Sequence, residues 1–317
     1  MKYHIKKLDV NNFDVMEEGK LSGRSYFIPY TSKKILSKQT ALTERDKSDL
    51  VTVLSGKDWF FKYYEKVSRL PGYFDTDAVS FDKITVPSTW QRTGYESPVY
   101  LNTRYEFKRD YPNVPSEMSA GVYVKKFNVK ADTETCFVSF LGVCSCITLY
   151  VNGKYIGYSE CSHNMAEFDI SSVVKAGENE LLVIVTKWCN GTYLECQDMF
   201  RENGIFRDVY ITEYSAQYIY DLFVKTKGEN GVYSLDVECD IVGASKNLSL
   251  TAELYKDGNL VSDRKVSAEE KTVISFGETD VIEWNAEIPV LYDLFVTLKA
   301  GDDVRQTVRN KIGFKNV

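Results

Sequence analysis

The chain has 317 residues, of which 44% are hydrophobic and 26% charged, and its formal net charge is −6. This length allows two or three domains that each bury a core, and the acidic balance lacks the basic stripe of nucleic-acid binders. No segment approaches the roughly 20 apolar residues that cross a bilayer. We therefore expect neither a nucleic acid nor a membrane as a partner.

The first residues, MKYHIKKLDVNNFD, have no apolar run behind their lysines and so do not resemble a secretory signal. Residues 1–55 are polar and irregular, and we interpret them as an arm that packs on the first domain. The odd number of cysteines, seven, favours reduced thiols and a cytoplasmic location. With only two histidines in the chain, buried structural thiols are favoured over a metal site. The cysteines are Cys136, Cys144, Cys146, Cys161, Cys189, Cys196 and Cys239.

Strand patterns dominate residues 56–215, where aromatic and β-branched residues are frequent. Asn152-Gly153 stands between the long apolar stretch 135–151 and the short strand 154–158. Both turn residues accept the positive φ of a type I′ turn, so this is a strong hairpin signal. Cys144 and Cys146 lie two apart on an apparent strand, and we expect their side chains to face the same way. The other expected strands are 59–64, 83–86, 121–129, 180–188 and 205–210, and 170–175 could form one helical turn.

A second β unit begins near Tyr218. Its turns fall at Gly228-Glu229-Asn230-Gly231 and at Asp257-Gly258. Short strands at regular spacing over about 100 residues are typical of an immunoglobulin-like sandwich. Neither unit has the strand–helix alternation of an α/β protein, so we predict an all-β chain. The expected strands are 220–226, 233–241, 247–255, 271–276, 292–298 and 304–312.

Three stretches make this double sandwich more specific. They are VPSTWQRTGYESPVYLN (86–102), FLGVCSCITLYVNGKYIGYSECSHNMAEFD (140–169) and KWCNGTYLECQDMFRENGIFRD (187–208). In this order and spacing they resemble the sugar-binding jelly-roll domain of family 2 glycoside hydrolases of the β-galactosidase type. WNAEIPVLYDLFVTL (284–298) is similar to the immunoglobulin-like domain of that family.

The resemblance implies a jelly-roll sandwich over residues 56–215 and an immunoglobulin-like sandwich over 216–317. It also implies a retaining glycosidase with two carboxylates about 5 Å apart, carried on a (β/α)₈ barrel that follows the second sandwich. A barrel takes about 250 residues, and every residue here is assigned to the arm and the sandwiches. We therefore expect that the catalytic barrel is absent, that this chain holds no catalytic residue, and that it is inactive alone. The implied partners are the missing C-terminal barrel domain and a β-galactoside sugar, and a homo-oligomer stays open.

The main site residue that the resemblance implies is Asp198. In the family, the aspartate of the Gln-Asp-Met motif reaches into the active site of the barrel, binds galactose hydroxyls and helps to hold a sodium ion. A carboxylate suits both tasks, since it accepts several hydrogen bonds and oxygen ligands suit hard cations. The structural alternative is that Asp198 caps the adjacent turn or pairs with Arg201 or Arg207. Sodium and magnesium are cofactors that the resemblance allows in a full-length parent, and none is expected in this chain.

Cys144 occupies the position of a family asparagine that hydrogen-bonds the sugar. A thiol is a weak donor and a weak acceptor, so we expect this substrate contact to be lost or weakened. Phe200 stands where tryptophan is common in the family, and both residues mainly supply apolar area.

Several further side chains have the chemistry of a carbohydrate site. Trp90, Trp188 and Tyr193 could stack on a sugar, although a core role is favoured for the two tryptophans. Glu195 and Glu202 flank Asp198 in an acidic cluster that could imitate a catalytic pair. Without a barrel cleft, we interpret these two glutamates as surface charge.

The leading interpretation is an accessory region of a β-galactosidase-type hydrolase that supports the barrel and supplies Asp198 to the sugar site. The alternative is a free-standing carbohydrate-binding module, because a jelly roll alone can bind glycans. A purely structural pair of sandwiches is the third possibility that the fold permits.

Overall fold

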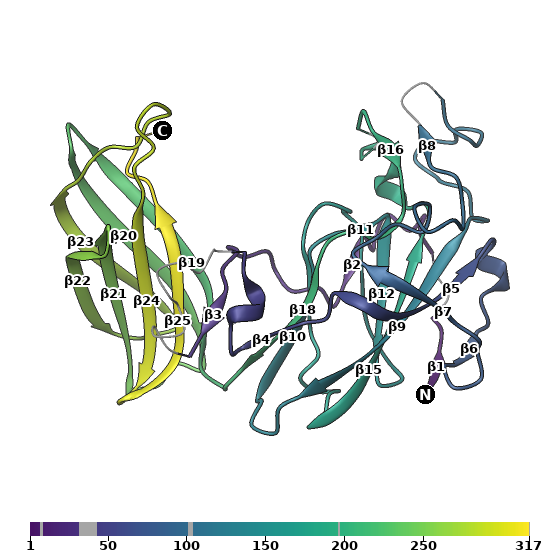
Figure 1. Cartoon of the computed structure of the whole chain (residues 1–317), viewed down its shortest axis with the longest axis horizontal. Helices are drawn as coiled ribbons and strands as arrows, with labels where there is room; N and C mark the ends of the chain where they lie inside the picture. Colours follow the sequence, from purple (N-terminus) through teal and green to yellow (C-terminus); the bar gives the residue numbers. More distant parts are fainter. Residues whose placement is uncertain (7–8, 32–42, 101–103, 196, 317) are drawn as a thin grey trace. The chain divides into compact units, whose positions relative to one another are not determined.

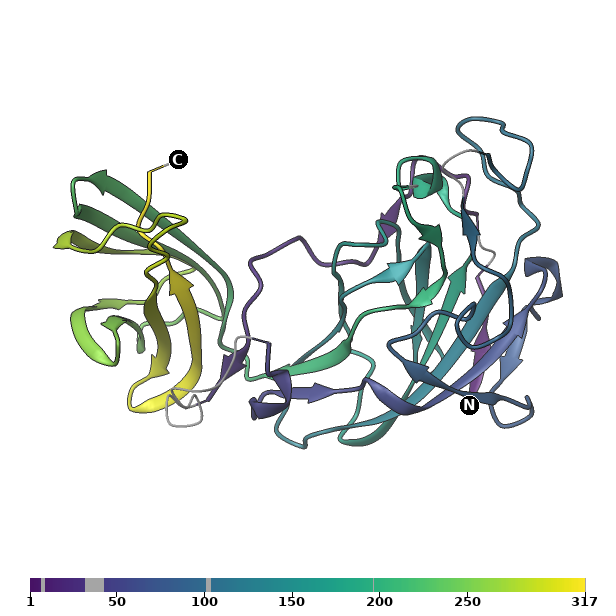
Figure 2. The same cartoon turned by 45° about the horizontal axis from the view of Figure 1, so that its top comes forward.

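Figure 1 shows the computed structural model of the chain, which describes residues 1–6, 9–31, 43–100, 104–195 and 197–316. The chain forms two compact units, one of Met1–Ser22 with Val53–Glu213 and the other of Gly23–Thr52 with Tyr214–Val317. The described residues form strands and short 3-10 helices but no α-helix, which confirms the all-β class (Figures 1 and 2). Within the described ranges, no helix has the length and apolar character needed to span a membrane.

The first unit is built on a seven-stranded and a four-stranded antiparallel sheet. In spatial order the larger sheet contains β2 (Glu17–Glu18), β13 (Lys154–Ser159), β12 (Cys146–Val151), β15 (Gly177–Thr186), β9 (Ala120–Val129), β5 (Gly56–Tyr64) and β7 (Asp82–Val86). The smaller one contains β14 (Ala166–Asp169), β10 (Thr135–Phe140), β18 (Val209–Tyr214) and β4 (Val51–Val53). Large side chains such as Trp59, Phe61, Tyr123 and Phe140 belong to one fully buried cluster of this unit. Burying each of them contributes about 1.5–3 kcal/mol to folding.

A short ribbon covers part of the outer face of the seven-stranded sheet. It consists of β1 (Lys2–His4) paired with β6 (Tyr73–Asp75). Tyr3 and Phe74 of this ribbon are buried with Tyr150 of β12 and Leu182 of β15. The N-terminal strand therefore closes a face that would otherwise be open to solvent.

The hairpin predicted at Asn152-Gly153 is confirmed, with φ values of 49° and 84°. The single strand that we expected to carry both Cys144 and Cys146 is wrong, because the two residues belong to different strands. Cys144 ends β11 (Val143–Cys144), which pairs with β17 (Gly204–Ile205), whereas Cys146 begins β12 in the large sheet. Because the strand is interrupted at Ser145, the period-2 alternation does not continue across it.

The strand expected at 205–210 is also two elements. Ile205 ends β17 and Val209 begins β18, and between them the amide of Phe206 donates to the carbonyl of Gly142. At residues 170–175 the structure has a hydrogen-bonded turn, in which the amides of Val173 and Val174 donate to the carbonyl of Ile170.

The second unit is a sandwich of a three-stranded and a five-stranded sheet, as an immunoglobulin-like fold requires. The first contains β19 (Tyr218–Glu229), β20 (Val232–Val242) and β23 (Lys271–Asp280). The second contains β22 (Asn259–Ser267), β21 (Leu248–Lys256), β24 (Tyr292–Ala300), β25 (Asp303–Ile312) and β3 (Pro29–Tyr30). The two predicted turns are confirmed at Asn230-Gly231 and Asp257-Gly258, where each residue has a positive φ. Strand β22 was not predicted, because its residues are mostly exposed and show no apolar alternation.

The N-terminal residues do not form the single arm that we expected over the first sandwich. Met1–Ser22 belongs to the first unit and Gly23–Thr52 to the second, where β3 adds to the edge strand β25. Phe27 and Tyr30 explain this division, since both are buried, with Phe27 in the core of the second unit. Residues 7–8 and 32–42 of the expected arm lie outside the described residues.

The six described cysteines are free thiols. Five are buried, as expected for structural thiols, while Cys161 is exposed. Cys196 lies outside the described residues.

Candidate functional site

Asp198 lies on an exposed loop between η3 (Asn190–Tyr193) and β16 (Phe200–Arg201). Strand β16 pairs with β8 (Val99–Tyr100), which places Phe200 opposite Tyr100, with ring centroids 5.9 Å apart. The hydroxyl of Tyr100 donates a hydrogen bond to Oδ1 of Asp198. The predicted site residue therefore faces solvent on a loop that a second strand supports. Residues 101–102, which end the first quoted stretch, lie outside the described residues.

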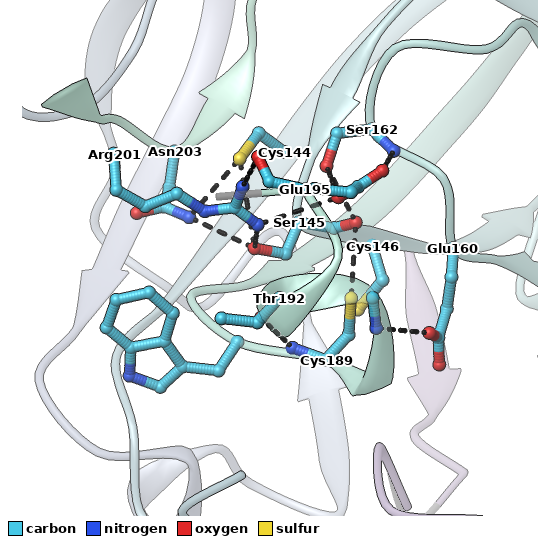
Figure 3. Close-up of polar contacts among 12 residues, drawn as sticks. Cys144, Ser145, Cys146, Glu160, Ser162, Cys189, Thr192, Glu195, Arg201 and Asn203 are labelled. Atoms are coloured by element: carbon cyan, nitrogen blue, oxygen red, sulfur yellow. Dashed lines mark hydrogen bonds and ion pairs between the residues drawn. The ribbon is translucent and has the colours of Figure 1, made fainter. Parts of the chain in front are cut away.

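The base of this loop is closed by an ion pair between Glu195 and Arg201, whose Oε2 and Nη2 atoms are 3.6 Å apart (Figure 3). The Arg201 side chain is only 5% exposed, and its Nη2 donates to Oγ of Ser145 at 2.9 Å. The amide and hydroxyl of Ser162 each donate to the Glu195 carboxylate at 2.6 Å. Both ends of the Asp198 loop are thus bound to the same part of the sandwich.

The interpretation of Glu195 and Glu202 as surface charge is wrong, because both side chains are only 16% exposed. Glu195 compensates the buried guanidinium of Arg201. Glu202 pairs with Nε of Arg92 at 2.7 Å and accepts a bond from Thr89 at 2.9 Å. A charge that is removed from water requires such partners. These ion pairs and hydrogen bonds therefore stabilise both carboxylates in their partly buried positions.

Asn203 connects the loop to the large sheet. It is fully buried, and its Nδ2 donates to the carbonyl of Lys187 at 2.9 Å. Gln91 and Asn203 also bond each other twice, since the Asn203 amide donates to Oε1 of Gln91 and Nε2 of Gln91 donates to Oδ1 of Asn203. The ammonium of Lys187 in turn binds Glu96 at 2.6 Å and Glu106 at 2.9 Å. These buried polar groups hold one another in fixed positions.

Cys144 is buried beside this network, with Sγ 3.7 Å from Nδ2 of Asn203 (Figure 3). Burial raises the pKa of the Cys144 thiol, although the nearby charge of Arg201 opposes the shift. A cavity of about 230 Å³ opens next to it, and Glu195 and Arg201 also contribute to its lining. The described lining includes Gln197 and Met199 on either side of Asp198, but not Asp198 itself. The two predicted positions therefore lie near one loop without sharing its cavity.

If Asp198 had a purely structural role as part of an ion pair, its expected partner would be Arg201 or Arg207. Arg201 is engaged with Glu195 and Ser145, and Nη1 of Arg207 donates to the carbonyls of Leu141 and His163. The role of Asp198 in a sugar site stays a prediction.

The core role expected for Trp90 and Trp188 is confirmed, since they are 0% and 3% exposed. Nε1 of Trp90 donates to Glu96, which explains how an indole is buried without losing its hydrogen bond. Tyr193 is half-buried, its ring lies 4.5 Å from that of Tyr111, and its hydroxyl donates to the carbonyl of Asn113.

Sequence reasoning missed the buried anchors of the loop. Arg201 and Asn203 stood within the quoted Gln-Asp-Met stretch, yet nothing local distinguishes a buried arginine from an exposed one. Across the part of the chain that the structure describes, no group of three or more His, Cys, Asp or Glu side chains is arranged to hold a metal ion. Sodium binding through Asp198 therefore stays a prediction.

Comparison with known proteins gives the family. Residues 51–215 match the sugar-binding domain of "Glycosyl hydrolases family 2", and residues 217–315 match a second domain of "Glycosyl hydrolases family 2". A β-galactosidase from Actinobacillus pleuropneumoniae is 34% identical over 92% of this chain and 28% of its own length. One from Staphylococcus xylosus is 33% identical over 99% of this chain and 30% of its own length. The chain thus spans about three-tenths of these relatives.

Solved structures agree on the fold. An FMN-binding β-glucuronidase from Facaelibacterium prausnitzii L2-6 has a TM-score of 0.64 at 16% identity, covering 84% of this chain and 39% of that protein. A β-glucuronidase from Ruminococcus gnavus has a TM-score of 0.61 at 19% identity, covering 84% of this chain and 45% of that protein. These structures show the fold, and the match of the family 2 model over residues 51–215, more than half of the chain, shows that the chain belongs to family 2 of the glycosyl hydrolases.

Proposed function

We propose that this chain serves as the non-catalytic front region of a retaining β-galactosidase-type hydrolase, which removes terminal non-reducing β-D-galactose residues. In that protein the chain supports the catalytic barrel and supplies Asp198 to the sugar site. Support comes from relatives called β-galactosidases that match 82–99% of this chain and extend well beyond the match. Their remaining length is ample for a barrel of about 250 residues.

The observation that carries the proposal is an exposed carboxylate on a loop with a rigid base. Asp198 faces solvent, while the half-buried Glu195 and the buried Arg201 on either side of it are bound together. A preorganised acceptor loses little conformational freedom when it binds a sugar hydroxyl, so more of the interaction energy appears as affinity. Asp198 and Tyr100 would also present oxygen ligands to a sodium ion, with the remaining ligands coming from the barrel and the sugar.

Cys144 changes what this proposal implies for the strength of sugar binding. Its thiol is buried and its pKa is raised by burial, so the group stays neutral and is a poor hydrogen-bond partner. A parent with this residue would bind the sugar with one strong contact fewer than a family member that carries asparagine. The free thiols of the described residues are consistent with the reducing cytoplasm as the proposed location.

The alternative, a free-standing carbohydrate-binding module, is less well supported. Tyr3 and Phe74 are buried against Tyr150 and cover part of the outer face of the large sheet, which reduces the surface that such a module could use. An exposed Asp198 loop also has no evident use in a module that acts alone.

A chimera tests the proposal. The segment of the Actinobacillus pleuropneumoniae relative that aligns with this chain is replaced by this chain, and hydrolysis of a chromogenic β-galactoside is measured. We expect activity in the chimera and none in a deletion that lacks the segment. A soluble, folded chimera that is as inactive as the deletion would contradict the proposed supporting role.

A further inference from the structure

The ribbon of β1 and β6 leaves one end of the outer sheet face open. The register pairs Phe60 of β5 with Val124 of β9, and Lys126 of β9 with Glu180 of β15. Opposite residues share a face, and so do residues two apart on one strand, so these four side chains lie on one surface. Phe60 is 37% exposed there, whereas its neighbour Phe61 points into the core and is fully buried. The apolar side chains of Phe60 and Val124 thus lie next to the charged side chains of Lys126 and Glu180.

The connection between β6 and β7 borders this surface on one side. Thr76, Val79 and Phe81 of that connection enclose a cavity of about 250 Å³ together with the four sheet residues. The ring centroids of Phe60 and Phe81 are 6.2 Å apart. Two phenylalanines therefore form an apolar side of the cavity.

The polar side of the cavity is built around Glu180, which is only 5% exposed. The hydroxyls of Tyr3 and Thr76 both donate to its Oε1, at 2.9 and 3.0 Å. None of the described residues donates a hydrogen bond to Oε2 of Glu180. This carboxylate oxygen can therefore accept a hydrogen bond from a ligand in the cavity. Asp77 and Lys126 complete the polar rim, where Lys126 is also bound to Glu178 at 3.1 Å and Asp77 pairs with the N-terminal ammonium of Met1 at 2.7 Å.

We propose that this cavity binds one pyranose ring of a neutral oligosaccharide. The apolar C–H face of such a ring would lie against Phe60 and Phe81, and its hydroxyls would donate to Glu180 and Asp77 and accept from Lys126. The volume is below the roughly 300–1,000 Å³ of sites for drug-sized ligands, which suits a single ring. The rim carries the carboxylates of Glu180 and Asp77 together with two cations, Lys126 and the N-terminal ammonium that is bound to Asp77, so its charges balance and favour a neutral ring.

This site is independent of the Asp198 loop and goes beyond the proposed function. Its residues come from β5, β9, β15 and the β6–β7 connection, none of which carries the Gln-Asp-Met motif. A second saccharide contact would hold a distant unit of an extended glycan. Because few polar groups converge on the ring, we expect a Kd on the order of 1–10 mM.

The test is a titration of the ¹⁵N-labelled chain with lactose, followed by NMR. We expect saturable shifts of the amides of Val124, Lys126 and Glu180, and at least a tenfold weaker Kd in Phe60→Ala. Phe223→Ala is the matched control, because Phe223 is an exposed phenylalanine (53%) of the second unit. Shifts that do not saturate, or that are equally strong in Phe60→Ala, would overturn the proposal.

Two further arms separate this site from the Asp198 loop. Lys126→Ala, a change at an exposed side chain that spares the core, should also weaken lactose binding. Asp198→Ala should leave the shifts unchanged. If the shifts instead centre on Tyr100 and Arg201 and vanish in Asp198→Ala, the cavity is not the site, while the proposed function gains support.

Discussion

Replacing Arg201 by alanine should strongly destabilise the first unit. The substitution leaves the Glu195 carboxylate, 16% exposed, without its cation and Ser145 without a charged donor. Breaking a buried ion pair costs about 3–5 kcal/mol, and the two bonds that Ser162 still donates to Glu195 reduce this to about 2–4 kcal/mol. For a unit of this size, a loss of about 3 kcal/mol corresponds to a Tm lower by about 6–12 °C.

Tryptophan fluorescence is a suitable probe of this melting transition, since Trp59, Trp90 and Trp188 lie in the first unit and only Trp284 in the second. Arg69→Ala is the matched control. Arg69 also pairs with a glutamate, Glu65, but the two side chains are 62% and 69% exposed, so its loss should cost about 0–1 kcal/mol.

A double-mutant cycle with Glu195→Gln then isolates the pair. Arg201 and Glu195 should show a coupling free energy above about 1 kcal/mol. Equal Tm shifts for Arg201→Ala and Arg69→Ala, or a coupling near zero, would refute the idea that this pair closes the base of the loop.

Three other outcomes can be checked on the chain as it stands. It should not hydrolyse a chromogenic β-galactoside, and turnover that survives removal of host enzyme would contradict this. Burial opposes ionisation of Asp293, but hydrogen bonds from Lys311 and Arg309 lower its pKa overall. The stability that it contributes should therefore be present above about pH 3.9 and be lost as the pH falls further, so the unfolding free energies of wild type and Asp293→Asn should converge in acid. Cys161→Ser should remove a fast-reacting thiol in an Ellman titration, whereas Cys239→Ser, at a buried position, should not.

Local signals predicted much of the fold. Asn152-Gly153 and Asp257-Gly258 fix their hairpins because both residues adopt positive φ, which is a property of the dipeptide itself. Strand β22 escaped prediction because it is an exposed edge strand with no apolar alternation. Residues 23–52 were assigned to the wrong unit because edge pairing of Pro29–Tyr30 with β25 depends on a partner far away in the sequence.

The candidate site was predicted only in part. The exposed position of Asp198 agrees with a residue that points out of its own sandwich, but its loop is held by contacts that no local pattern reveals. Glu195 reaches Ser162, and Arg201 reaches Ser145, across long sequence separations. Such buried partners follow from the requirement that charges inside a protein be compensated, which becomes specific only when the fold is known.

The most direct test of the central claim is the Asp198→Ala substitution in the active chimera, with kcat/KM and Tm measured on the same sample. Losing a charge-assisted hydrogen bond to a sugar hydroxyl corresponds to about 1.5–3 kcal/mol, so kcat/KM should fall about 10- to 150-fold while Tm stays unchanged. Asp263→Ala, at an exposed aspartate of β22, is the control and should change neither quantity. A mutant of Asp198 that melts early yet hydrolyses the galactoside at the normal rate would remove Asp198 from the sugar site.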